Sequence, residues 1–167
     1  MAKSIYGMKG TRVEIEGDKE LIKKLNAMSK GFRSKALLHA VMQGGEIIER
    51  EAKANAPARP GGGLLRDAIT TIELKETSKL AKAAVGWRTS KASQFPAFYG
   101  IMVEKGTKAR KRNKWRGERL LTGPVSTGTM PSHPFLLPAY DNKRTEAARK
   151  IKVELSRLVR KAAKKGI

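Results

Sequence analysis

Several residue types are scarce in this 167-residue chain, and each scarcity excludes a kind of structure. There is no cysteine, so disulfide bonds and thiolate metal sites are excluded. Aromatic residues make up 5%, which predicts a core built mainly from aliphatic side chains. No apolar run approaches the roughly 20 residues that span a bilayer, and the basic residues 1–10 lack the apolar segment of a secretory signal. We therefore expect a soluble protein that is made in a cytoplasm.

Catalytic motifs are missing as well. The two histidines, His39 and His133, do not belong to a metal-binding spacing such as His-Glu-x-x-His. The glycine run at residues 61–63 is not followed by the Gly-Lys-Ser/Thr of a phosphate-binding loop. Nothing in the chain resembles the nucleophile elbow of a serine hydrolase. The sequence therefore predicts a protein that is not an enzyme and that carries no cofactor.

One group of carboxylates, Glu46, Glu49 and Glu51, could in principle hold Mg²⁺. Arg50 and Lys53 lie among them, however. On a helix, i,i+4 pairing such as Glu46 with Arg50 explains this arrangement without a metal. We expect no metal site here.

Acidic residues are few relative to basic ones: 15 Asp and Glu stand against 36 Lys and Arg, for a formal charge of +21. Such a charge favours acidic partners, namely nucleic acid, an acidic protein surface or an anionic membrane. The excess of basic residues is greatest in residues 108–119, which carry seven cations, one acid and a tryptophan. Phosphate binding, an acidic protein partner and a solvated charge run all remain open. The candidate binding residues are Lys108, Arg110, Lys111, Arg112, Lys114, Trp115, Arg116 and Arg119.

Helical patterns occupy three stretches. The first follows a possible N-cap at Asp18 and is punctuated at Gly31. The second runs from a cap at Ser34 to about residue 54, and Pro57 prevents it from continuing. Its apolar stripe is Leu37, Leu38, Val41, Met42, Gly45, Ile48 and Ala52, and the glycines at 44 and 45 suggest close packing on a neighbour.

The third pattern is very basic and extends from Asp141 to about residue 164. Ten Lys and Arg residues lie between Lys143 and Lys165. Its expected buried stripe is Ala147, Ile151, Leu155, Leu158 and Ala162, with Val159 beside it.

Strand patterns occupy residues 11–16, 65–75 and 82–88, and the last two are expected to form an antiparallel hairpin. Residues 1–10 are expected to be a loose arm. Residues 95–104 predict a short buried helix that stops at Gly106. Residues 108–129 show no convincing period, so they predict a long surface loop or a β-hairpin extension. The fold class is therefore α+β: long helices and a C-terminal helix packed on a small, mostly antiparallel sheet.

Residues 130–141 form a Pro-rich segment around the apolar residues Phe135, Leu136, Leu137 and Tyr140. Each proline fixes its own φ near −65° and restricts the residue before it. A segment this stiff has less conformational entropy to lose on ordering. It is expected to dock in one conformation.

The order of motifs resembles the tail-completion or neck proteins of long-tailed bacteriophages, which are also described as head–tail joining proteins or minor tail components. The resemblance covers most of the chain and is carried by several short motifs. They are Gly17-Asp18-Lys19-Glu20-Leu21, Ala56-Pro57 followed by Gly61–Gly63, Leu65-Arg66-Asp67-Ala68-Ile69, Val85-Gly86, the segment from Phe98 to Thr107 that ends in Val103-Glu104-Lys105-Gly106-Thr107, and the Pro-rich segment from Pro131 to Asp141. In the family, a short link often joins Gly-Thr to the Pro-rich segment, whereas here residues 108–129 intervene.

The resemblance implies a single neck domain over residues 1–167, with residues 108–129 as a basic insertion. It implies a structural virion protein at the head–tail junction, assembled in the host cytoplasm, that forms a ring for genome passage. Six copies are the preferred number and twelve remain open, with connector and tail proteins as neighbours. Tyr99, Phe135, Leu136 and Tyr140 would pack within a subunit or between neighbours, and the insertion would reach DNA in the channel or an acidic neighbouring ring. The alternative is a free-standing basic nucleic-acid-binding protein.

Overall fold

The computed structural model describes residues 5–7, 19–57, 64–76, 80–88, 97, 99–116 and 119–164. Two sequence predictions lie outside these residues: the strand at 11–16 and the cap at Asp18. The elements in chain order are β1 (Ile5–Gly7), α1 (Lys19–Ala27), α2 (Lys30–Asn55), α3 (Leu64–Ala68), β2 (Ile69–Glu76), β3 (Ala81–Arg88), α4 (Gly100–Lys105), β4 (Thr107–Arg116), β5 (Arg119–Met130) and α5 (Leu136–Lys164).

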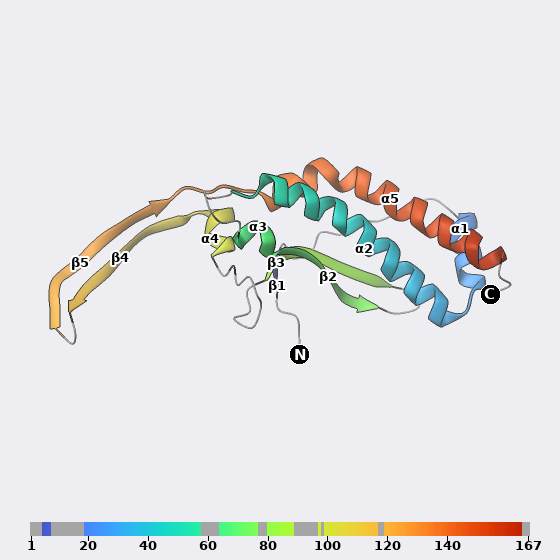
Figure 1. The fold of residues 1–167 in the computed structure, drawn as a ribbon, viewed down its shortest axis with the longest axis horizontal. Coiled ribbons are helices and arrows are strands. Elements are labelled where there is room, and N and C mark those ends of the chain that lie inside the picture. The colour runs from blue at the N-terminus through green and yellow to red at the C-terminus, as the bar shows by residue number, and fades with distance from the viewer. Residues whose placement is uncertain are drawn as a thin grey trace.

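Helix α2 lies at the centre of the body, between α5 on one side and a three-stranded sheet on the other (Figure 1). The sheet has the order β1-β3-β2, and both pairs are antiparallel. Helices α2 and α5 run side by side in opposite directions, and α1 packs near the end of α5 (Figure 1). A second, two-stranded sheet, β4–β5, extends away from the body at the opposite end. The α+β prediction is confirmed.

The buried face of α2 differs from the predicted stripe. Ile48 and Ala52 are buried as expected, but Leu37, Leu38, Val41 and Met42 are only half-buried. A line of mostly small residues at a spacing of four faces the neighbours instead: Ala36, Ala40, Gly44, Ile48 and Ala52. Because α2 is packed on two sides, small residues let the neighbouring backbones approach, and the larger side chains fill the flanks.

The boundary between α1 and α2 differs from the prediction, whereas the end of α2 agrees with it. Ser29, rather than Ser34, caps α2, and its Oγ accepts the Phe32 N–H at 3.4 Å. Gly31 does not end α1 but lies in the first turn of α2. At the other end, the prediction is confirmed: α2 ends at Asn55, and Ala56 is extended (ψ 132°), as expected for a residue before proline.

Two predicted coil or strand segments form other structures. Residues Leu64–Ala68 are a short helix, and the strand begins only at Ile69. Leu65 and Ala68 are both buried, and their three-residue separation suits a helical turn better than a strand. Ile5–Gly7, placed in a loose arm by the sequence, pairs with β3. The β2–β3 hairpin itself is confirmed.

The C-terminal helix begins five residues earlier than predicted, at Leu136 rather than at Asp141. Pro138 is its third residue, where a missing N–H costs no intrahelical bond. Ala147, Ile151, Leu155 and Ala162 are buried as expected. Leu158, predicted to lie in the buried stripe, is only half-buried, and the adjacent Val159 is buried instead. The short helix before Gly106 is also confirmed, as α4.

Candidate nucleic-acid interface

The basic insertion is an antiparallel β-ribbon, so the hairpin alternative is correct and the surface-loop alternative is wrong. Its strands pair from Thr107–Met130 at the base to Arg116–Arg119 near the tip. The curved ribbon extends away from the helices and the three-stranded sheet (Figure 1). We call residues Thr107 to Met130 the basic arm.

The cations of the basic arm lie mainly on β4. Five of them occupy every second position of that strand, which is a period the sequence analysis did not recognise: Lys108, Arg110, Arg112, Lys114 and Arg116. Lys111 lies between these positions and Arg119 begins β5. The side chains of Lys108 and Lys111 are exposed. The arm thus brings all seven predicted cations, and Trp115, into one ribbon.

Irregular pairing bends this ribbon. The register shifts several times between Thr107 and Trp115, and the pairing passes from Arg112–Val125 to Lys114–Thr122. The residues skipped on β5 are Gly123 and Pro124, and proline has no N–H to donate to a partner strand. Such bulges increase twist and bend a strand, which agrees with the curvature in Figure 1.

The base of the basic arm is closed by a hydrogen bond within the arm and lies against the end of α4. Gly106 ends α4 with φ 71°, and a Cβ added there would lie 2.7 Å from the Met130 carbonyl oxygen. The Met130 N–H donates to Thr107 Oγ1 at 3.1 Å. The His133 N–H donates to the Val103 carbonyl at 2.8 Å. Glycine is therefore required at 106, where the chain turns from α4 into the arm.

A single carboxylate, Glu104, caps α5. Its oxygens accept the backbone N–H groups of Phe135, the residue before α5, and of the first two helical residues, at 2.9 Å from Phe135 N, 3.1 Å from Leu136 N and 3.1 Å from Leu137 N. The N–H groups of a first turn have no partner within the helix, and the helix dipole favours an anion there. Sequence reasoning placed Glu104 in a motif but missed this role, because the acceptor lies more than thirty residues before its donors.

The residues predicted to pack at interfaces divide by burial. Phe135 is fully buried and Leu136 is 3% exposed, and both belong to the core of the subunit. The centroid of the Phe135 ring lies 5.5 Å from that of the Trp87 ring, and the two rings are tilted relative to each other. Tyr99 is half-buried against the same core, and Tyr140 is half-buried on α5. Phe135 and Leu136 therefore serve packing within the subunit, while Tyr99 and Tyr140 keep part of their surface outside it.

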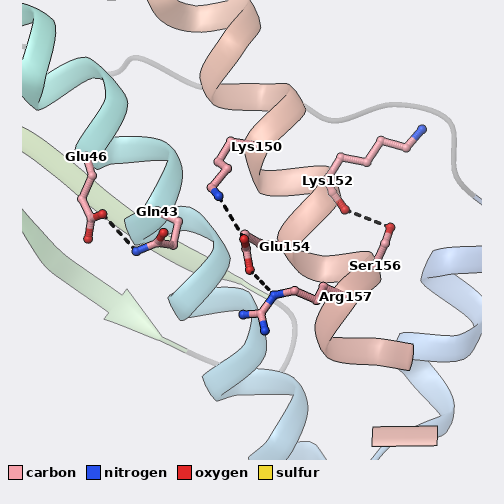
Figure 2. A network of polar contacts seen from close by, with 7 residues as sticks. All are labelled: Gln43, Glu46, Lys150, Lys152, Glu154, Ser156 and Arg157. Carbon is pink, nitrogen blue, oxygen red and sulfur yellow. Dashed lines mark hydrogen bonds and ion pairs between the residues drawn. The ribbon is translucent and has the colours of Figure 1, made fainter. Parts of the chain in front are cut away.

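The three carboxylates of α2 do not converge. Glu49 reaches the sheet, where it accepts the Thr71 N–H at 2.7 Å and pairs with Lys53 Nζ at 2.6 Å. Glu46 instead accepts from Gln43 Nε2 at 3.0 Å, on the exposed side of the helix (Figure 2). Among the residues that the structure describes, no three His, Asp or Glu side chains are grouped so as to hold a metal ion.

The basic helix α5 carries its own charge compensation. Glu154, 8% exposed, accepts from Lys150 Nζ at 3.0 Å and from Arg157 Nε at 2.7 Å (Figure 2). These hydrogen bonds, with Arg157 the stronger influence, lower the pKa of Glu154. Because Lys150 and Arg157 are engaged with Glu154, they are less available to an external anion than unpaired cations would be. None of the helices in the described ranges is long and apolar enough to cross a membrane.

The sequence of the body identifies the family of the chain. A family model described as "Bacteriophage HK97-gp10, putative tail-component" matches residues 19–106, from the start of α1 to the residue before the basic arm. The match covers more than half of the chain, and the chain belongs to this family. It is thus a tail-related structural component of a bacteriophage virion. No curated protein and no solved structure matches the chain.

Proposed function

We propose that the protein forms a ring at the head–tail junction of a long-tailed bacteriophage, joins the tail to the capsid connector and lets the genome pass. Membership of the phage tail-component family carries this proposal. The ring is homomeric, preferably of six copies or alternatively of twelve. It is a structural protein and not an enzyme.

Closed rings use heterologous contacts, in which one patch binds a different patch on the next copy. An exposed apolar side chain at the start of α5 suits such a contact. Leu137 is 43% exposed although its neighbours Phe135 and Leu136 are buried. Tyr140 lies three residues further along the same helix and is half-buried. Leu137 and Tyr140 therefore present an apolar surface beside the base of the basic arm.

The test is particle mass by light scattering, with negative-stain imaging, for the protein alone and with connector or tail-tube components. We expect a closed ring in at least one of these conditions. Leu137→Asp should abolish the ring without loss of fold, because the side chain is exposed. Val153→Asp is the matched control: Val153 is also an exposed aliphatic residue of α5, and its replacement should leave the ring intact. A monomer in every mixture would contradict the proposal.

The formal charge of +21 favours a second candidate, a free-standing nucleic-acid-binding protein. That function predicts tight DNA binding by a persistent monomer that never joins a ring. The same mass measurement, made with and without a DNA duplex, separates the two candidates.

A further inference from the structure

The basic arm lacks the packing that normally stabilises a two-stranded sheet. Its strands pair with each other, and in the described part of the chain neither packs against a helix or the three-stranded sheet beyond the base. Isolated two-stranded ribbons are marginally stable in water. A third strand or a helix packed against the ribbon usually supplies the missing stability. A ribbon of 10 and 12 residues per strand therefore gains from a surface outside the subunit.

Charge argues against a second copy of this chain as that surface. The arm has seven Lys and Arg against one Glu, a net +6 of the chain's +21, which leaves +15 on all other residues. The net positive charge of a neighbouring copy therefore repels the arm, even though that copy also carries some acidic side chains. The partner must be strongly anionic.

Shape and length favour duplex DNA over an acidic protein. A two-stranded ribbon fits the major groove, which is about 12 Å wide. At about 3.3 Å per residue, the ten residues of β4 extend about 33 Å, close to one turn of duplex. The cations are distributed along the whole length of β4, from Lys108 to Arg116, so the strand carries positive charge over a length that matches many phosphates of a duplex.

We propose that the basic arm, residues Thr107 to Met130, is a duplex-DNA-binding arm that contacts the phosphate backbone without reading sequence. The bulge at Gly123 and Pro124 bends the ribbon so that it follows a curved surface. That the duplex is the phage genome in the channel rests on the proposed ring function, whereas binding of the arm to DNA does not.

The experiment measures the affinity of the full chain for a fluorescein-labelled 30-base-pair duplex by anisotropy, between 50 and 200 mM KCl. The test variant replaces Lys108, Arg110, Lys111 and Arg112 by Gln. The matched control replaces two exposed Arg and two exposed Lys of α5, Arg144, Arg149, Lys161 and Lys164, by Gln, so that both variants lose four charges. Circular dichroism melting checks that both remain folded.

We expect the arm variant to bind at least about tenfold more weakly. Its slope of log affinity against log salt should be shallower by about 3 to 4, roughly one for each lost phosphate contact. The α5 variant should stay close to the unmodified protein. Equal losses in the two variants would overturn the proposal, since binding would then follow total charge. Displacement of the duplex by poly-glutamate at equal charge concentration would also overturn it, in favour of an acidic protein partner.

The particle-mass experiment distinguishes the two proposals. A ring whose DNA affinity does not depend on the arm overturns the DNA-binding arm and leaves the neck function. Arm-dependent binding by a chain that never forms a ring overturns the neck function and leaves the DNA-binding arm.

Discussion

Two consecutive glycines in α2 show how single residues set the spacing of the layers. A Cβ added at Gly44 would lie 2.5 Å from Ile151 Cγ1 and 3.2 Å from the Ala147 carbonyl oxygen of α5. A Cβ added at Gly45 would lie 2.5 Å from Thr71 Cγ2 of β2. The sequence suggested close packing as the reason for this pair, and the structure shows that each glycine faces a different layer.

Gly44→Ala is expected to lower the free energy of unfolding by up to about 2 kcal/mol. Overpacking against α5 costs about 1 to 3 kcal/mol, and the roughly 1 kcal/mol gain in helix propensity offsets only part of it. Gly31→Ala is the control, because nothing lies within 4 Å of an added Cβ there, and it should be neutral or stabilising. Urea denaturation measures both; equal effects of the two changes would contradict the packing explanation.

Glu49 predicts a pH-dependent contribution to stability. Partial burial raises its pKa, but hydrogen bonds from Lys53 and Thr71 outweigh this and hold the pKa below the ordinary 4.5. A carboxylate with a lowered folded-state pKa stabilises the fold above its unfolded pKa, and the contribution disappears as the pH falls through the folded pKa. Glu49→Gln should therefore destabilise the protein at pH 7, and the difference from the unmodified protein should shrink below about pH 4.5.

Denaturation curves between pH 3 and pH 7 test this expectation. Glu46→Gln, on the exposed side of the same helix, should change stability by less than about 0.5 kcal/mol at neutral pH. A constant difference between Glu49→Gln and the unmodified protein at every pH would argue against the ionised carboxylate as its cause.

At the scale of elements, Glu104 joins α4 to α5. Its carboxylate accepts three N–H groups at the start of α5, so Glu104→Gln leaves one oxygen acceptor where there were two and removes the negative charge from the helix N-terminus. We expect a loss of about 1 to 3 kcal/mol in the free energy of unfolding. Thermal and urea denaturation measure it. A loss no larger than that of the surface change Glu46→Gln would show that the cap is dispensable.

We expect the body to fold without the basic arm, because the strands of the arm pair mainly with each other. Thr107 and Met130 are directly paired, so a two-residue Asn-Gly turn can replace residues 108–129 without moving the base. We expect this shortened chain to fold and to unfold within a few degrees of the full protein. Circular dichroism and calorimetry test this. Loss of cooperative unfolding would show instead that the arm is part of the core.

At the scale of the whole molecule, the charge of +21 makes the folded state repel itself. The unfolding temperature is therefore expected to rise between 20 and 300 mM NaCl, because salt screens repulsion between exposed charges. The shortened chain, with a net charge nearer +15, should show a smaller rise than the full protein. Differential scanning fluorimetry measures both. An unfolding temperature that is flat or falls with salt would mean that ion pairs dominate over repulsion.

The sequence by itself determined the elements whose signals are local. Apolar periodicity placed α1, α2 and α5, Pro57 ended α2, Gly106 ended α4, and the β2–β3 hairpin followed from two alternating runs. The order of motifs indicated the family, and the concentration of Lys and Arg identified the basic segment. In each case a few neighbouring residues carry the information, because backbone preference and side-chain period are short-range properties.

Only the tertiary structure decided what depends on distant neighbours. The close approach of α5 and the sheet decided which face of α2 is buried. Glu104, distant in sequence, allowed α5 to begin at Leu136 inside the Pro-rich segment. The pairing of β4 with β5 made a ribbon out of a charge run with no apolar pattern. Strand pairing and long-range capping join residues far apart in the chain, so no local window of the sequence contains them.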